Sequence, residues 1–303
     1  MDNINLFKKI PTILEIRSLS ITDEIKEKIS PDFLEQALQN EKKIYAYRIV
    51  YLSQGHKVVG YILEPKEPPT MPCPCIIYNR GGSNEFGSIK IGQLFLYLCR
   101  FALQGYITFF TQYSGNGGSE GKDEFGGRDL EDVLNLYEII KQYKNADSRR
   151  VGMYGASRGG MMTYLSISRV DWIRAAVVLS GLADLPSQLV YRPEMLQKFK
   201  DMFDGAESDL IKRSALYFGD KFKKNVPLLM MHGSADWRVS PLDSIMLSAK
   251  LYKEKVPHRL VLFEGGDHAL TEFKEESVNM SIAWFNRFVR DLEPLPDLEP
   301  HGA

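Results

Sequence analysis

Short apolar runs alternate with amphipathic segments along most of the chain. The runs have the length of β-strands and lie at Cys75–Tyr78, Ile107–Thr111, Arg150–Tyr154, Ala175–Leu179, Leu228–Met231 and Arg259–Phe263. Between them, apolar side chains recur every three or four positions, which predicts helices at Ile89–Leu103, Leu130–Tyr143, Gly159–Ser168, Leu242–Lys255 and Glu272–Leu292. Strands that are apolar on both faces are typical of a parallel sheet covered by helices on both sides. The pattern predicts an α/β fold with a mostly parallel, twisted sheet.

The region before this alternation has a different pattern. Lys43–Leu52 and Lys57–Leu63 are rich in Ile, Val and Tyr, and the turn residues 53–56 separate them. This arrangement predicts an antiparallel hairpin. Ile21–Asn40 carries apolar residues at helical spacing, although Pro31 must break or restart that helix.

These patterns divide the chain into three parts. We expect an N-terminal helical extension over residues 1–43, an α/β domain over 44–292 and a frayed tail over 293–303. Residues 184–224 form a mixed helical region between two predicted strands. This region is either a small cap over a site or a plain pair of connecting helices.

Composition and charge narrow the class of protein. The chain has 303 residues, 44% of them hydrophobic and 25% charged, which is typical of a globular protein. Its 38 basic and 39 acidic residues leave a formal net charge of -1, so we expect no nucleic-acid partner. No apolar run approaches the roughly 18–20 residues of a membrane span, and the N-terminus lacks the apolar core of a signal peptide. We therefore expect a cytoplasmic protein without a membrane partner.

The cysteines predict no special chemistry. Cys73, Cys75 and Cys99 are too few for a disulfide framework, and no second Cys/His pair stands at metal-ligand spacing. The glycine-rich segments also lack the phosphate-binding fingerprints GxxxxGK[ST] and GxGxxG. We expect buried thiols, no metal and no organic cofactor.

The segment Gly155-Ala156-Ser157-Arg158-Gly159 is the central chemical signal. A GxSxG match alone is weak, but here a predicted strand leads into it and a predicted helix leads out. The helix N-terminus directs backbone N–H groups at an oxyanion above the serine. The sequence therefore predicts Ser157 as a nucleophile and the Arg158 amide as an oxyanion donor. The alternative is a serine that only caps a helix.

A serine hydroxyl requires a base. His268 lies on a glycine-rich loop after the last predicted strand, where an imidazole can reach the carboxyl edge of the sheet, and we expect it to be that base. His232 ends a strand, and we expect it to be structural. The remaining histidines lie in the hairpin turn, at a strand start and in the tail: His56, His258 and His301.

An acid must orient the base. Asp236 follows the predicted strand Leu228–Met231 and lies between the serine and the histidine in chain order. Three other acids compete with it: Asp184, Asp243 and Asp267. Asp267 is too close in sequence to its neighbouring histidine to orient that ring well, and we expect Asp236 to be the acid.

An oxyanion hole needs a second donor. The loop after the first predicted parallel strand reads YNRGGSN over residues 78–84, and its paired glycines let backbone amides approach a substrate. We expect Arg80 and Gly81 to contribute here. The glycine-rich residues 115–121 are expected to form a flexible loop beside the pocket.

Five segments together carry a family resemblance: YNRGGSNEFG, YSGNGGSEGKDEFGG, YGASRGGMM, HGSADWRVSP and EGGDHAL. Over roughly residues 44–290, the chain resembles the catalytic domain of the prolyl oligopeptidase-like serine peptidases, within the α/β-hydrolase superfamily. The resemblance implies acyl transfer through a serine ester. It implies Ser157 as nucleophile, His268 as base and then acid, and Asp236 as the residue that orients the imidazole.

The chain departs from that family at two points. Only some forty residues precede the first predicted strand, so we expect no β-propeller of the kind that the large peptidases carry. Arg80 stands where some relatives place a tyrosine whose hydroxyl is an oxyanion donor. Arg80 either supplies a cationic donor or points away and leaves only amides.

The function that follows is that of a serine hydrolase acting on a peptide, amide or ester bond of a short peptide or small molecule. The peptidase assignment rests on the resemblance, and a carboxylesterase for small acyl esters is the alternative. A non-catalytic binding protein on the same scaffold is a third hypothesis. Tyr113, Phe125 and Trp237 are candidate pocket walls, with a core position as the alternative for each. The oligomeric state stays open.

Overall fold

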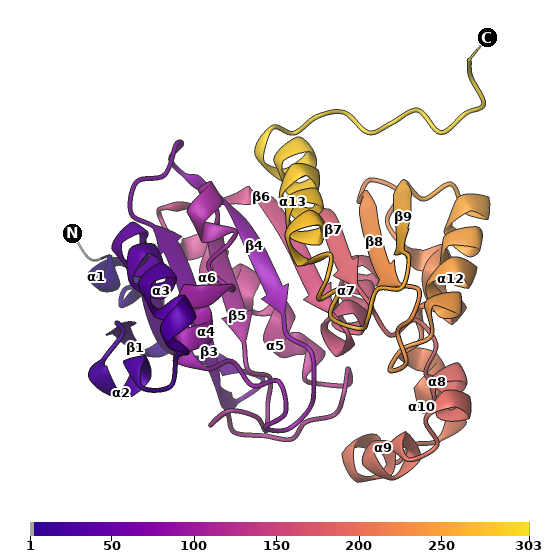
Figure 1. Cartoon of the computed structure of the whole chain (residues 1–303), viewed down its shortest axis with the longest axis horizontal. Helices are drawn as coiled ribbons and strands as arrows, with labels where there is room; N and C mark the ends of the chain where they lie inside the picture. The colour runs from indigo at the N-terminus through magenta and orange to yellow at the C-terminus, as the bar shows by residue number, and fades with distance from the viewer. Residues whose placement is uncertain (1–2, 303) are drawn as a thin grey trace. The chain divides into compact units, whose positions relative to one another are not determined.

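The computed structural model describes residues 3–302 (Figure 1). The chain divides into two compact units, the first made of Met1–Asp123 and Arg128–Val151, the second of Glu124–Gly127 and Gly152–Ala303. The boundary falls inside strand β6, Ala146–Ala156, which begins in the first unit and ends in the second. None of the helices within residues 3–302 combines the length and the apolar character that crossing a bilayer requires.

Five strands of the first unit lie in the order β1-β2-β3-β5-β4. The first three pair antiparallel, β3 pairs antiparallel with β5, and β5 pairs parallel with β4. The strands are β1 Ile13–Leu19, β2 Ile44–Ser53, β3 His56–Pro65, β4 Cys73–Asn79 and β5 Ile107–Thr111. The predicted change from an antiparallel hairpin to parallel strands is therefore confirmed.

The turn between β2 and β3 explains why this hairpin forms. Gln54 and Gly55 are its two central residues, with φ of 48° and 82°. Positive φ at both positions matches the right-handed twist of the flanking strands, and glycine adopts it without steric strain. The hairpin register is thereby fixed by the turn.

The N-terminal segment is only partly helical. It contains α1 (Ile4–Phe7), α2 (Asp23–Lys26) and α3 (Pro31–Lys43), with Pro31 in the first turn of α3. It also contains β1, which pairs with β2. The expectation of a wholly helical extension is therefore wrong for β1. Only Ile13 of this strand is buried, so the sequence carries little of the apolar alternation that reveals a strand.

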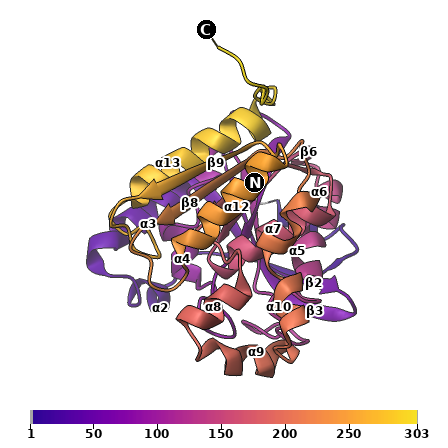
Figure 2. The same cartoon turned by 90° about the vertical axis from the view of Figure 1, so that its right-hand side faces the viewer.

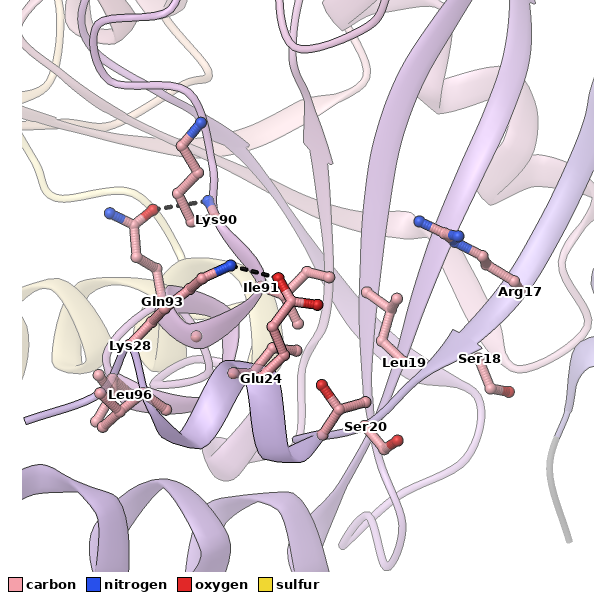
Figure 3. Close-up of a pocket in the computed structure, with 14 residues that line it drawn as sticks. Arg17, Ser18, Leu19, Ser20, Glu24, Lys28, Lys90, Ile91, Gln93 and Leu96 are labelled. Atoms are coloured by element: carbon pink, nitrogen blue, oxygen red, sulfur yellow. Dashed lines mark hydrogen bonds and ion pairs between the residues drawn. The ribbon is translucent and has the colours of Figure 1, made fainter. Parts of the chain in front are cut away.

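Strand β1 forms one wall of a hollow in the first unit (Figure 3). The hollow has a volume of about 720 Å³ and lies between the end of β1, helix α2 and the start of α4. Leu19 and Ile91 line it, Arg17 stands at its edge, and Lys28 pairs with Glu24 at 2.5 Å. The N-terminal segment therefore shapes the surface of this unit.

The apolar core of the first unit joins helices to the antiparallel strands. Leu94 and Phe95 of α4 pack with Ala37 of α3 and Val59 of β3 in one buried cluster. The helices of this unit after α3 are α4 Ile91–Leu96, the 3₁₀ turn η1 Ala102–Gln104, α5 Leu130–Leu134 and α6 Leu136–Gln142. The three cysteines are buried free thiols, as predicted: Cys73, Cys75 and Cys99.

The second unit contains parallel strands with helices on both faces. Strand β8 pairs parallel with β7 and with β9. Helix α13 packs against β7 and β8, and α12 packs against β8 and β9, so these strands lie between helices (Figure 2). The elements are β7 Ile173–Leu179, β8 Leu228–Gly233, β9 His258–Phe263, α7 Arg158–Arg169, α12 Pro241–Lys253 and α13 Lys274–Phe285, followed by a π-helical turn η3 at Asn286–Arg290. The predicted α/β class, with a mixed sheet, is confirmed.

Helices connect β7 to β8. They are α8 Leu185–Tyr191, α9 Met195–Phe203, α10 Glu207–Lys212 and α11 Ala215–Phe218, followed by the 3₁₀ turn η2 Gly219–Lys221. Figure 1 shows α8, α9 and α10 grouped at one end of the strands of this unit. Helix α8 contacts α9 and α10, whereas α11 contacts α7 and α12. Residues 184–224 therefore form several short helices, more than the connecting pair that was one of the two expectations.

Candidate active site

The turn from β6 into α7 holds Ser157 in a strained conformation. Ser157 has φ 56° and ψ -122°, and it immediately precedes the first residue of α7. A Cβ at Gly155 would lie 2.1 Å from the carbonyl oxygen of Gly159, which no side chain tolerates. Only glycine at position 155 therefore allows the strand and the helix to approach closely enough to make this elbow.

Backbone hydrogen bonds fix the elbow at the end of the neighbouring strand. Ser157 N–H donates to the carbonyl of Leu179, the last residue of β7, at 2.9 Å. Arg158 begins α7, and its buried guanidinium lies 4.8 Å from the ring centre of Phe125. The positive end of the α7 dipole and the Arg158 amide are therefore held beside the serine, where they can stabilise an anion.

Asp236 lies on the loop after β8 and is held by four hydrogen bonds. Its Oδ1 accepts from the backbone N–H groups of Arg238 at 2.8 Å and Val239 at 3.1 Å. Its Oδ2 lies 2.7 Å from His268 Nδ1 and 3.1 Å from His232 Nε2. Burial opposes the charged form, but these hydrogen bonds outweigh it and hold the pKa of Asp236 well below its ordinary value. The carboxylate is therefore a permanent anion at neutral pH.

His268 follows β9 and contacts this carboxylate directly. Because Nδ1 faces the carboxylate oxygen, the neutral ring carries its hydrogen on Nδ1 and its lone pair on Nε2. The two loops also bond through their backbones, since Ala235 N–H donates to the Gly266 carbonyl at 3.0 Å. A Cβ at Gly233 would lie 2.2 Å from that same oxygen, so glycine is required there too. The acid and the base are thus one rigid assembly.

The competing acids have other hydrogen-bond partners. Asp184 accepts from Ser187 N–H at the start of α8, and Asp243 accepts from the Ser187 hydroxyl at 3.0 Å. Asp267 accepts from the backbone and hydroxyl of Thr271. Of the four candidate acids, the structure thus brings Asp236 to the imidazole of His268.

His232 makes a contact with Asp236 that the sequence did not predict. It was expected to be structural, and its ring is indeed fully buried, yet it contacts the carboxylate of Asp236. The two residues stand four positions apart across the end of a strand. That spacing, with a polar residue closing an apolar run, was the signal available in the sequence.

In the first unit, Arg80 stabilises its own loop. Its guanidinium donates to the carbonyls of Gln112 at 2.8 Å and Gly81 at 3.0 Å, and it lies 5.0 Å from the ring centre of Tyr113. The Tyr113 hydroxyl donates to the Arg80 carbonyl at 2.9 Å. Arg80 is buried, so its side chain does not point outward into solvent.

The three candidate pocket walls differ in exposure. Tyr113 is fully buried, and Phe125 is buried with its ring against Phe199 of α9 at 5.2 Å. Both are core side chains, the alternative that the sequence left open. Trp237 is 68% exposed, and the guanidiniums of Arg192 and Arg238 lie 5.4 Å and 5.2 Å from its ring centre. Among these three, only the indole next to Asp236 offers a surface to a ligand.

Within residues 3–302, no group of three or more His, Cys, Asp or Glu side chains is arranged to hold a metal ion.

Comparisons with known proteins show which family this chain resembles. Residues 95–291 match the model of the prolyl oligopeptidase family. The uncharacterized peptidase YtmA of Bacillus subtilis is 31% identical over 208 residues, covering 68% of this chain and 79% of that protein. The acylamino-acid-releasing enzyme of Rattus norvegicus is 24% identical over 246 residues, covering 74% of this chain and 33% of that protein.

A solved structure supports the fold. The acylaminoacyl peptidase of Pyrococcus horikoshii superimposes with a TM-score of 0.71 at 21% identity, over 99% of this chain and 46% of that chain. The present chain thus spans most of YtmA, but only a third to a half of these larger relatives. The superposition shows an α/β-hydrolase fold, and the family model covers more than half of the chain. The chain belongs to the prolyl oligopeptidase family of serine hydrolases.

Proposed function

We propose that this protein is a serine peptidase that cleaves short peptides through an acyl-enzyme, with Ser157 as nucleophile, His268 as base and Asp236 as orienting acid. The observation that carries the proposal is the 2.7 Å contact between His268 Nδ1 and Asp236 Oδ2, in the same unit as the strained Ser157 elbow. Three residue types in these roles are what acyl transfer by a serine requires.

In the first half of the reaction, Ser157 Oγ attacks the carbonyl carbon of the scissile bond and its proton passes to His268 Nε2. The imidazolium that forms is stabilised by the Asp236 carboxylate. The carbonyl oxygen becomes an oxyanion, which the Arg158 amide at the start of α7 stabilises. The tetrahedral intermediate then collapses. His268 gives its proton to the leaving nitrogen, and the amine departs.

In the second half, water attacks the acyl carbon of the serine ester. His268 Nε2 accepts a proton from that water, and a second tetrahedral intermediate forms. Its collapse breaks the bond to Ser157 Oγ, which recovers the proton from His268, and a carboxylic acid is released. Asp236 stays ionised throughout, as expected from a pKa held below its ordinary range.

The relatives suggest which substrates to test first. Two of the similar proteins are named for the release of acylamino acids or as acylaminoacyl peptidases. We therefore expect this chain to hydrolyse N-acylaminoacyl or aminoacyl p-nitroanilides. Short-chain p-nitrophenyl esters should be assayed beside them, because turnover confined to the esters would replace the peptidase with a carboxylesterase.

The nucleophile is tested by covalent labelling. An alkyl fluorophosphonate is expected to add one phosphonyl group to Ser157, located by mass spectrometry of the peptide that contains it. Ser157→Ala is expected to abolish labelling and to lower kcat by at least about 10³-fold, with little change in melting temperature. Folded wild-type protein that resists labelling and hydrolyses neither substrate class would favour a binding protein instead.

A further inference from the structure

Two imidazoles share one oxygen of the Asp236 carboxylate. His232, in β8, is fully buried, and its Nε2 lies 3.1 Å from the same Oδ2 that His268 Nδ1 approaches at 2.7 Å. We propose that His232 is a positioning residue whose N–H holds Asp236 in the orientation that His268 requires and moderates how strongly His268 binds its proton. This inference rests on the proposed function, in which Asp236 serves the catalytic base.

The atoms around the ring decide where its hydrogen lies. Nε2 faces the Asp236 carboxylate and the Val239 carbonyl, both at 3.1 Å, and neither group has a hydrogen to donate. Nε2 must therefore carry the hydrogen. Nδ1 lies 2.8 Å from the Ser244 hydroxyl, which can donate to it. Ser244 thus selects the neutral tautomer whose single N–H is shared by the Asp236 carboxylate and the Val239 carbonyl.

This contact ties Oδ2 of Asp236 to a strand, which the backbone amides that bind the carboxylate do not do. The amides of Arg238 and Val239 both bind Oδ1 and come from the same tight turn as Asp236 itself. They hold Oδ1, so the position of Oδ2 depends on its own two partners, His232 and His268. His232 binds Oδ2 from the preceding strand, so the two anchors on opposite oxygens lock the carboxylate plane.

The contact between His232 and Asp236 also affects how strongly Oδ2 binds His268. Because Oδ2 accepts from His232, it is a weaker acceptor for His268 than an oxygen with one partner would be. Removing the His232 donor should strengthen the bond from His268 and favour the imidazolium. The histidine would then act as a base only at higher pH, so the acidic limb of the profile of kcat/KM should move upward.

Other ionisable groups around His232 leave this role intact. Asp243 of α12 interacts electrostatically with His232, and Asp184 at the start of α8 interacts in the same way with Asp243. Asp243 accepts from the Ser187 hydroxyl and Asp184 accepts from the Ser187 N–H, so neither carboxylate replaces Asp236 as the acceptor of the Nε2 hydrogen.

The test uses two amides that differ by one methylene. In His232→Gln, the amide nitrogen reaches the position of Nε2, where it can donate to Asp236. In His232→Asn, it reaches only the position of Nδ1, beside Ser244. We expect the asparagine variant to lower kcat by about tenfold or more, with KM little changed, because it loses a hydrogen bond to a charged group. The glutamine variant should recover most of that loss.

Two further readouts separate positioning from simple stability. The acidic limb of the pH profile should move upward in His232→Asn and stay near its wild-type position in His232→Gln. In an inactive Ser157→Ala background, the downfield proton resonance of the His268 Nδ1–H bond should shift on His232→Asn, even though no turnover is measured. A merely structural role would move neither the profile nor the resonance.

His258→Gln is the matched control, because His258 also contacts a serine of α12, Ser248 at 2.9 Å, but has its other nitrogen on the Val256 carbonyl. It should leave the pH profile in place. Folded, fluorophosphonate-labelled Gln and Asn variants of His232 with equal kcat and unmoved profiles would overturn the role of His232 alone. Wild-type protein that neither labels nor turns over would overturn the proposed function, and this inference with it.

Discussion

A buried aspartate stays ionised only when enough donors surround it, and two aspartates of the second unit show the contrast. Asp236 is buried with four donors, and its pKa lies below the ordinary value. Asp243 is buried with the Ser187 hydroxyl on Oδ1, while its Oδ2 has no hydrogen-bond partner. Burial, followed by the repulsion of Asp184, raises the pKa of Asp243 to about 6. The number of donors, rather than depth, separates the two.

This contrast predicts that Asp243→Asn stabilises the protein above pH 6. The folded state binds the Asp243 proton more tightly than the unfolded state, whose pKa is near 3.8. Wild-type stability therefore falls as pH rises from about 4 to 6, by at most about 3 kcal/mol for this shift. Asparagine cannot ionise, so its free energy of unfolding should exceed the wild-type value by roughly 1–3 kcal/mol at pH 8. Urea unfolding at pH 8 and pH 4 measures the difference.

The control for this change is Asp32→Asn, an exposed aspartate in the first turn of α3. It should lower stability by about 0.5 kcal/mol at pH 8, because a charge at a helix N-terminus is favourable. The prediction for Asp243 fails if its asparagine variant gains as much at pH 4 as at pH 8, since the gain would then not depend on ionisation.

At the scale of the element, the nucleophile elbow depends on one missing methyl group. A Cβ on Gly155 would meet the Gly159 carbonyl at 2.1 Å and Thr163 Oγ1 at 2.4 Å. The nearest atom is backbone of α7, which can move away only if the helix separates from β6. Gly155→Ala should therefore lower the free energy of unfolding by more than about 3 kcal/mol and remove most of the activity. Thermal unfolding and fluorophosphonate labelling measure the two losses.

Gly55→Ala separates crowding from backbone strain. Gly55 has φ 82° in the β2–β3 turn, and nothing lies within 4 Å of the Cβ it would gain. This variant should cost only about 1–2 kcal/mol, the penalty for a left-handed conformation. Equal losses for the two variants would show that the elbow glycine is kept for its flexibility rather than for close packing.

Elements that are apolar on both faces were predictable, and the amphipathic edge strand was not. The run Ile107–Thr111 is buried throughout and coincides with β5, because burial on both faces leaves a continuous apolar signal. In β1, Glu15 and Arg17 interrupt the pattern, and the strand is held by its pairing with β2. Pairing between distant segments leaves no local trace in a sequence.

The same reasoning applies to the candidate site. Ser157, Asp236 and His268 each follow a predicted strand, so their place at strand ends could be inferred from the pattern. The hydrogen bond from His232 to Asp236 could not, because the four-residue spacing only suggests that the two residues are near each other and does not show where the ring nitrogens point. The burial of Tyr113 and the inward turn of Arg80 likewise depend on tertiary contacts.

At the scale of the whole molecule, the two ends of the chain differ in how they are held. Residues of the N-terminal segment join the core, since Ile21, Ile29 and Ala37 belong to the buried cluster of the first unit. β1 also covers the edge of β2. By contrast, residues 294–302 form no helix or strand and are exposed. The N-terminal segment is therefore part of the fold, although it lies outside the matched family region, which begins at residue 95.

Removing the N-terminal segment should therefore disrupt folding, whereas removing the C-terminal tail should leave stability almost unchanged. A chain that starts at Ile44 would expose the edge of β2 and the apolar surface that α3 covers, so it should be insoluble or lose cooperative unfolding. A chain that ends at Glu293 loses residues that are exposed throughout the described range 294–302. One of them, Glu299, pairs with Lys255 at the surface, and surface ion pairs contribute little. Its melting temperature should stay within about 2 °C of the full chain. Calorimetry of both truncated chains tests the comparison, and a soluble, cooperatively unfolding chain from Ile44 would show that the parallel strands and their helices fold without β1.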